Sequence, residues 1–106
     1  MSETGKIRIM EELQVLVEFT GVSRILSGVS EVSLKVAPGS TFSDIVNDLG
    51  QKYPSLLGQI IDKNGRDFIA TNLFSLNGQR IIQEGEMNGT PSNGDRLILV
   101  SLLAGG

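Results

Sequence analysis

The sequence predicts an α+β fold, a mixed sheet of four to five strands packed on one main helix, in a single domain spanning residues 1–106. Three observations predict it. Two early segments alternate apolar and polar residues with the period of two of a half-buried strand. The segment after them has apolar residues at helical spacing behind a capping residue. The chain then closes with an apolar run after a turn signal, and 106 residues suffice for one core but not for two.

The first two strands are expected at residues 13–19 and 31–36, paired as an antiparallel hairpin. The apolar residues that alternate with more polar neighbours are Leu13, Val15, Val17, Phe19, Val32, Leu34 and Val36. The segment between the strands is expected to be a loop in which Ile25 and Leu26 plug an open end of the core. Residues 1–12 are expected to form either a flexible N-terminal extension or the start of the first strand.

The clearest helix signal lies between residues 41 and 53. Thr41 can cap a helix there, and Asp44, three residues later, completes a capping box. The apolar residues of this segment fall on one face; they are Phe42, Ile45, Val46, Leu49 and Tyr53. Gly50 is expected to weaken the last turn, and Pro54 to stop the helix.

The following region carries weaker signals. Residues 55–61 are expected to continue as a short second helical segment, and residues 62–66 as a solvated turn. Phe68 and Ile69 are expected to start a strand that is interrupted and resumes at residues 73–76.

Asn77-Gly78 is a strong hairpin signal, because both residues tolerate the positive φ of a type I′ turn. Residues 79–82 would then form a short return strand. Residues 83–93 are rich in glycine and polar residues and are expected to be a long loop into the last strand.

Composition excludes several classes of function. The chain contains no cysteine and no histidine, which removes disulfides, thiolate nucleophiles, imidazole bases and the usual zinc sites. A net charge of −3 provides no basic footprint, so direct binding to nucleic acid is not expected. The acidic residues are scattered rather than paired in an enclosed cleft, and we therefore do not expect an enzyme.

No apolar stretch approaches transmembrane length, and the first residues lack the pattern of a signal peptide. A cytoplasmic protein without a membrane partner is expected.

The end of the chain carries the most specific motif. Gly94-Asp95 precedes the last apolar run, and Gly105-Gly106 follows it. Their order and spacing resemble the C-terminus of the ubiquitin-like sulfur carriers of the MoaD/ThiS family, which includes the ubiquitin-related modifier and small archaeal modifier types. The resemblance extends from about Leu13 to Gly106. It implies a β-grasp (ubiquitin-like) fold whose last strand lies parallel to the first in the middle of the sheet.

The resemblance also implies a chemistry that needs no catalytic side chain. A partner activating enzyme would use ATP to adenylate the carboxylate of Gly106, and a sulfur donor would then replace AMP to form a thiocarboxylate. The carrier itself would bind no cofactor. Residues 103–106 would be a flexible tail, and contacts with partners would come from Gly105, Ala104, Leu103, Leu102, Val100 and Ile98. The alternative is that the two glycines are only a frayed end.

The last strand should present two different faces. Leu97 and Leu99 are expected to face the core, which turns Ile98 and Val100 to the opposite face of the sheet together with Leu16. An apolar patch exposed there would mark a contact site. The alternative is that the patch is covered by the loop around Ile25 or by an N-terminal extension.

Three functions follow from these patterns. The first is a sulfur carrier for molybdopterin (molybdenum cofactor) biosynthesis, as a small subunit that inserts its tail into a synthase large subunit. The second is a carrier for tRNA thiolation or protein conjugation, because residues 101–106 are also similar to the ending of the ubiquitin-related modifier. The third is a plain β-grasp binding module with an idle tail.

Overall fold

The computed structural model describes residues 12–102. The expected N-terminal extension, except for Glu12, and the whole of the expected tail at residues 103–106 therefore lie outside the described residues. The elements follow in the order β1 (Leu13–Phe19), α2 (Gly21–Ser27), β2 (Glu31–Val36), α3 (Phe42–Lys52), η1 (Pro54–Leu56), β3 (Asn72–Leu76), β4 (Arg80–Ile81), η2 (Glu84–Glu86) and β5 (Arg96–Ser101).

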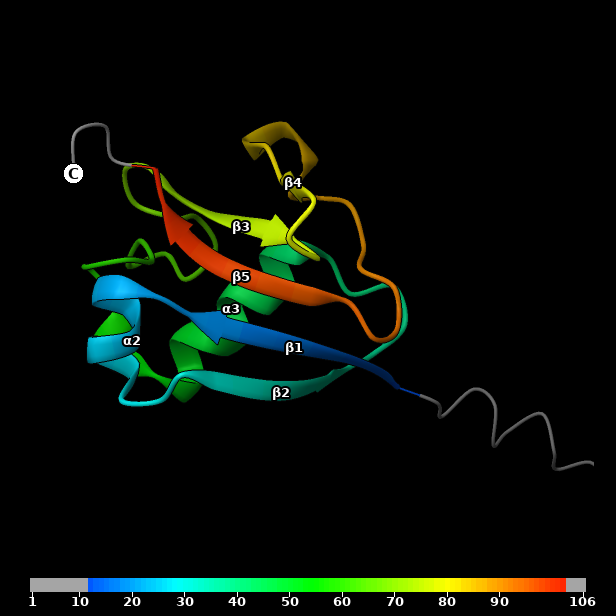
Figure 1. Ribbon diagram of the computed structural model, residues 1–106, viewed down its shortest axis with the longest axis horizontal. Coiled ribbons are helices and arrows are strands. Elements are labelled where there is room, and N and C mark those ends of the chain that lie inside the picture. The colour runs from blue at the N-terminus through cyan, green and yellow to red at the C-terminus, as the bar shows by residue number, and fades with distance from the viewer. Residues whose placement is uncertain (1–11, 103–106) are drawn as a thin grey trace, which may run out of the picture.

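The strands form one mixed sheet in the order β2-β1-β5-β3-β4. β1 pairs antiparallel with β2 and parallel with β5, with Val17 opposite Leu97. β5 pairs antiparallel with β3, with Leu99 opposite Phe74. Figure 1 shows β1 and β5 running side by side through the middle of the sheet, with α3 crossing behind them. The predicted β-grasp fold, including the parallel central pair, is confirmed.

The core lies between one face of the sheet and α3. Its buried residues are Val15, Val17, Phe19, Val36, Phe42, Ile45, Val46, Leu49, Leu56, Ile60, Ile61, Phe74, Ile82, Leu97 and Leu99. Val32 and Leu34 also pack against this cluster but remain partly exposed, because they lie on β2, an edge strand of the sheet. The helix face and the strand faces predicted from periodicity are thus the ones that meet.

α3 begins with the predicted capping box. The Thr41 hydroxyl accepts a hydrogen bond from the Asp44 backbone N–H at 3.1 Å, and the Asp44 carboxylate accepts one from the Thr41 N–H at 2.9 Å. Gly50, expected to weaken the helix, is buried, and a Cβ at this position would lie 2.9 Å from Leu57 Cδ2. The glycine therefore permits close packing of the helix against the segment after it.

The predicted loop between β1 and β2 is wrong: residues 21–27 form the short helix α2. Ile25 does not plug the core, since its side chain is 78% exposed, whereas Leu26 packs against the core as expected. The helix escaped the periodicity argument because its most buried residue is Ser23. It ends at Gly28, which takes the left-handed conformation with φ 80°.

The second helical segment expected at 55–61 is also shorter than predicted. Only the 3-10 turn η1 forms, and Gly58, with φ +84°, turns the chain away from a helical path. Phe68 forms an isolated bridge with Ile61 rather than the start of a strand. The hairpin prediction is confirmed, because Asn77 and Gly78 have φ values of 54° and 69°.

Candidate functional site

The candidate site begins at the C-terminal end of β5. The Leu102 N–H donates to the Thr71 carbonyl at 3.0 Å, and the Thr20 hydroxyl donates to the Leu99 carbonyl at 2.6 Å. These bonds hold the strand up to its last residues. The Leu102 side chain is 51% exposed, so the chain continues toward residues 103–106 from a surface position. Leu103, Ala104, Gly105 and Gly106 themselves lie outside the described residues.

The turn that supplies the Thr71 carbonyl is backed by a buried amide. Asn72 is 9% exposed, and its side-chain amide donates to the Ile69 carbonyl at 2.6 Å. Ala70 takes a positive φ of 56°, which is uncommon for a residue with a Cβ. This turn therefore holds a fixed backbone acceptor beside the root of the expected tail.

Gly94-Asp95 serves the register of β5. Gly94 has φ +89°, and its N–H donates to the Gln14 carbonyl at 2.7 Å. The Asp95 carboxylate accepts from the Ser92 N–H at 2.8 Å and from the Asn77 side-chain amide at 3.0 Å. The motif thus closes the turn before β5 and ties it to the β3–β4 hairpin.

The two faces of β5 are the predicted ones. Leu97 and Leu99 are 0% and 1% exposed on the core side. Ile98 and Val100 point to the opposite side, where they are partly exposed. We call the half-buried apolar residues of this side the open-face patch: Leu16, Leu73, Ile98 and Val100. Leu73 and Val100 lie opposite each other on β3 and β5.

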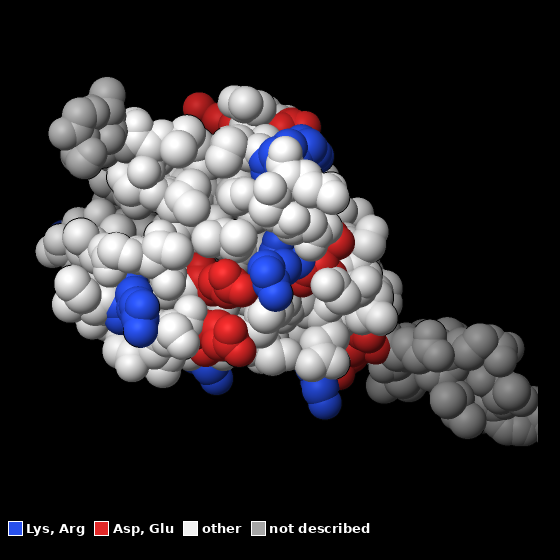
Figure 2. Space-filling model, in the orientation of Figure 1, with Lys and Arg blue, Asp and Glu red and all other residues white. Residues whose placement is uncertain are grey.

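α2 borders the open-face patch without covering it, since Ile25 is itself in solvent. Figure 2 views this face of the molecule: charged groups gather over β1 and β2, and an uncharged area extends over β3 and the C-terminal end of β5. At the border, Arg96 pairs with Glu18 at 3.0 Å. The patch is therefore an apolar area with a charged margin, a common arrangement at protein contacts.

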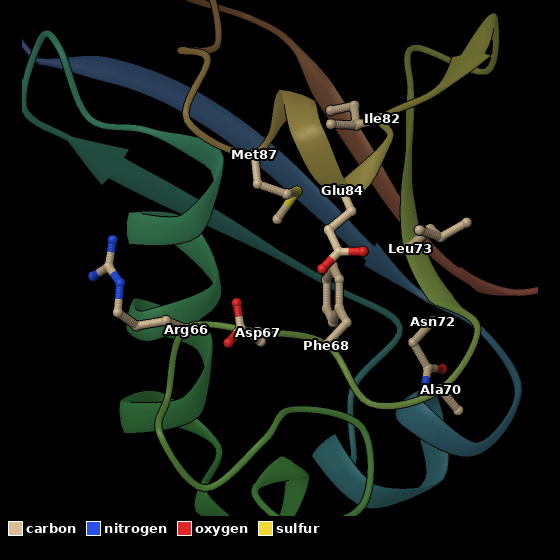
Figure 3. A pocket seen from close by; sticks show the side chains of 9 residues that line it. All are labelled: Arg66, Asp67, Phe68, Ala70, Asn72, Leu73, Ile82, Glu84 and Met87. Atoms are coloured by element: carbon tan, nitrogen blue, oxygen red, sulfur yellow. The ribbon is translucent and has the colours of Figure 1, made fainter.

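A separate hollow of about 290 Å³ lies between β3 and the η2 segment, with Phe68, Ile82 and Met87 among its apolar residues. Figure 3 shows that Arg66 points away from the other lining side chains, and its guanidinium lies 3.6 Å from Asp44. The Asp67 carboxylate accepts from the Asn64 amide at 2.8 Å. The hollow assembles no nucleophile–base pair that would indicate catalysis.

Among residues 12–102, Asp44, Asp48 and Glu86 have shifted pKa values, each with a structural cause. The hydrogen bond from the Thr41 backbone lowers the pKa of Asp44, and the one from the Gln83 backbone lowers the pKa of Glu86. Partial burial, followed by the charge of Asp44, raises the pKa of Asp48. These groups lie on α3 and η2, not at the end of β5, and Asp44 and Glu86 serve the caps of these two elements.

Within residues 12–102, no group of three or more acidic side chains is placed to hold a metal ion. In the same part of the chain, no helix has the length and apolar character needed to cross a membrane.

The fold defines the class of structure: a ubiquitin-like β-grasp domain in which the residue after the last strand, Leu102, is exposed. No model of a known protein family matches the chain, and no curated protein matches its sequence. Solved structures do match. SAMP1 from Haloferax volcanii superposes with a TM-score of 0.73 at 18% identity, covering 88% of this chain and 99% of that one.

Two further solved structures, of differently named proteins, also match. A putative molybdopterin converting factor, subunit 1, from Pyrococcus furiosus gives a TM-score of 0.64 at 17% identity, over 84% of this chain and 97% of that one. Urm1 from Trypanosoma brucei gives 0.55 at 19% identity, over 90% and 97%. The resemblance expected from the terminal motifs is therefore confirmed at the level of the fold.

The sequence predicted β5 and its two faces, but it did not reveal the residues that hold the C-terminal end of β5. Thr20 bonds to Leu99 of β5 across 79 residues, and Thr71 bonds to Leu102, the residue directly after β5. Thr20 carried a local signal, because Ser23 three residues later makes it a helix start. Thr71 holds Leu102 through its backbone carbonyl, and no sequence pattern reports that contact.

Proposed function

We propose that this protein is a sulfur carrier whose C-terminal Gly106 is adenylated and then converted to a thiocarboxylate by a partner activating enzyme. The observation that carries the proposal is the placement of the last strand. β5 is the central strand of a ubiquitin-like sheet, and the residue after it, the half-exposed Leu102, lies four positions before Gly106 in the sequence. Four residues span at most about 14 Å when extended, which is enough to enter a narrow channel in another protein.

The chemistry takes place on the backbone carboxylate. A carboxylate oxygen of Gly106 attacks the α-phosphorus of ATP, and pyrophosphate leaves. Hydrosulfide from the sulfur source then attacks the acyl carbon of the adenylate, AMP leaves with the bonding electron pair, and loss of the sulfur-bound proton gives the thiocarboxylate. The partner enzyme supplies ATP and the positioning groups, so the lack of histidine and cysteine in this chain is compatible with the reaction.

In this proposal, the contact residues divide into two groups. Leu102, Leu103, Ala104 and Gly105 would lie in the channel, where glycine allows the backbone of the partner to approach closely. Ile98 and Val100, in the open-face patch, would contact the body of the partner. Within this proposal the protein acts in the cytoplasm, where ATP is available.

Molybdopterin is the proposed destination of the sulfur, with the protein as the small subunit of a synthase. The fold similarity to the Pyrococcus furiosus protein titled molybdopterin converting factor, subunit 1, supports this choice. A second candidate is a modifier or tRNA-thiolation carrier, supported by the fold similarity to SAMP1 and Urm1. The two candidates share the activation step and differ in the acceptor.

The test is the intact mass of the protein after incubation with ATP, a candidate activating enzyme and a sulfur source. We expect one oxygen to be replaced by sulfur in the full chain, and no change in a variant that lacks Gly106. The control is a second carrier on which the same enzyme preparation is active. An unchanged mass of the full chain beside a thiocarboxylated control would reject the carrier and favour a binding module.

The acceptor is tested separately. Transfer of the sulfur to a molybdopterin precursor in the presence of a synthase large subunit would support the first candidate. Recovery of Gly106 in an isopeptide bond with lysine, or sulfur transfer to tRNA, would support the second. Full biological activity after removal of Gly105 and Gly106 would contradict both.

A further inference from the structure

The helix α2 exposes apolar side chains that the fold does not use. Val22 and Ile25 are 58% and 78% exposed, whereas Ser23 between them is 1% exposed. Residues three apart lie on the same side of a helix, so Val22 and Ile25 form one apolar strip. Ser23 is buried because its hydroxyl bonds to Thr20 at both the carbonyl (2.8 Å) and the N–H (3.2 Å). Folding thus buries a serine and leaves an isoleucine in water.

α2 is held in place at both ends. At its start, the Thr20 hydroxyl donates to the Leu99 carbonyl of β5 at 2.6 Å. At its end, the Leu26 carbonyl accepts from the Ser55 hydroxyl at 2.6 Å. Figure 1 shows α2 at the end of the sheet where β1 and β5 finish. The strip is therefore a fixed feature beside the last described residues of β5.

A hollow connects this strip to the open-face patch. It has a volume of about 380 Å³, and its apolar lining includes Val22 from α2, Ile60, and Val100 from the patch. Thr71, whose carbonyl holds Leu102, also lines it. An apolar path therefore runs from the sheet face, past the root of the tail, to α2.

The strip carries one positive charge. Arg24 is the only charged residue of α2, and none of the ion pairs within residues 12–102 includes it. Figure 2 shows an isolated basic group over α2, surrounded by uncharged surface. In a chain of net charge −3, such a site attracts a negatively charged group through local complementarity.

The length of the tail decides which protein can reach this surface. Four residues from Leu102 to Gly106 reach at most about 14 Å, so an enzyme that acts on Gly106 must lie close to the end of β5. The open-face patch and the tail offer far fewer residues than the about 20–30 per partner of a stable interface. α2 is the apolar surface next to both.

We propose that Val22, Arg24 and Ile25 form a second docking surface for the enzyme that takes up the tail. That enzyme presents an apolar strip to Val22 and Ile25 and a carboxylate to Arg24. The inference rests on the proposed function, because the tail is what places the enzyme here.

The test uses the full chain and the activating enzyme that passes the intact-mass assay, with ATP–pyrophosphate exchange as the readout. We expect V22S/I25S to raise the KM for the carrier about tenfold or more while kcat stays within about twofold. R24E should raise KM similarly, and R24K should not. The matched control is K35E, which reverses an exposed charge opposite Gln14, at the other end of β1. Because the altered side chains are exposed, unfolding midpoints should match the unaltered protein.

Three results would overturn the inference. An unchanged KM for V22S/I25S, with the unaltered protein active, would reject the surface and leave the carrier function standing. If V22S/I25S raised the KM and R24E did not, the proposed carboxylate of the enzyme opposite Arg24 would be rejected. A concentration-dependent dimer of the unaltered protein that V22S/I25S abolishes would assign the surface to a second copy of the chain. No exchange with the unaltered protein would instead reject the proposed function itself.

Discussion

Asn77 and Asp95 show how polar side chains of this protein serve its turns. The Asn77 amide donates to Asp95 at 3.0 Å, and its oxygen accepts from the Arg96 N–H at 2.7 Å. Asp95 also accepts from the Ser92 N–H. Two turns far apart in sequence are thereby joined at the start of β5. Side chains of this kind resemble a catalytic cluster in composition, and only their backbone partners reveal a structural role.

We predict that Asn77→Ala lowers the free energy of unfolding by about 1–3 kcal/mol, because it removes two hydrogen bonds and leaves at φ 54° a residue that tolerates this conformation less well than asparagine. Asn77→Gly loses the same bonds but tolerates the backbone conformation, so it should be less harmful. Urea unfolding of the three proteins tests the order. Equal stability of Asn77→Ala and the unaltered protein would contradict this role.

The capping box of α3 predicts a dependence of stability on pH. The hydrogen bond from the Thr41 backbone lowers the pKa of Asp44 below its usual 3.8 in the folded state, and the charge of Arg66 lowers it further. Asp48 faces the same side of the helix, and partial burial, followed by the charge of Asp44, raises the pKa of Asp48. Because the pKa of Asp44 is lowered in the folded state, the ionised carboxylate stabilises the fold fully above pH 3.8. This stabilisation is lost as the pH falls through the folded-state pKa.

Asp44→Asn should therefore be less stable than the unaltered protein at neutral pH, and the difference should shrink as the pH falls below 3.8. Thermal unfolding across this range measures it. Glu31→Gln, which removes an exposed carboxylate on the edge strand that caps no helix, is the control for the loss of a negative charge. A difference that stays constant down to the acid limit would reject the capping role of the ionised carboxylate.

At the scale of the elements, β5 combines two tasks in alternate residues. Leu97 and Leu99 fill the core, while Ile98 and Val100 lie in the open-face patch. Strand geometry makes this separation possible, because successive side chains point to opposite faces. A substitution on one face can therefore change stability without changing the binding surface.

We predict that Leu99→Ala lowers the free energy of unfolding by about 2–5 kcal/mol, as expected for a buried leucine that is 1% exposed. Ile98→Ser, one position earlier, should cost much less stability but raise the KM for the activating enzyme. Chemical unfolding and pyrophosphate exchange, measured on both variants, separate the two effects. A full loss of stability in Ile98→Ser would show that this residue belongs to the core.

At the scale of the whole molecule, the fold joins the two ends of the described chain. β1 and β5 lie side by side as the central parallel pair, with Val17 opposite Leu97. β5 is necessary for the sheet, because it lies between β1 and β3. The β3–β4 hairpin is therefore joined to the β1–β2 hairpin within the sheet only through β5.

Removal of residues 96–106 should therefore abolish cooperative unfolding, whereas removal of Gly105 and Gly106 should leave the unfolding midpoint unchanged. Circular dichroism during thermal unfolding measures both. The short deletion should at the same time abolish adenylation. A large loss of stability after the short deletion would mean that the two glycines contribute to the fold rather than to a reactive tail.

Sequence by itself determined the elements whose burial follows a simple period. β1, β2, α3 and the two faces of β5 were predictable, because an alternating or helical pattern of apolar residues states directly which side is buried. Asn77-Gly78 was predictable because few residue pairs adopt that turn. The terminal Gly-Gly motif likewise pointed to the proposed reactive group, Gly106.

Only the tertiary structure decided the features that depend on distant partners. α2 forms although its buried residue is Ser23, since hydrogen bonds at Thr20 and Ser23 hold it in addition to the packing of Leu26. Leu102 is positioned by the carbonyl of Thr71, a group that every residue possesses. Apolar periodicity records what each segment buries, whereas backbone contacts across the fold leave no pattern in the sequence. The proposed α2 docking surface was therefore visible only once the end of β5 and α2 were seen together.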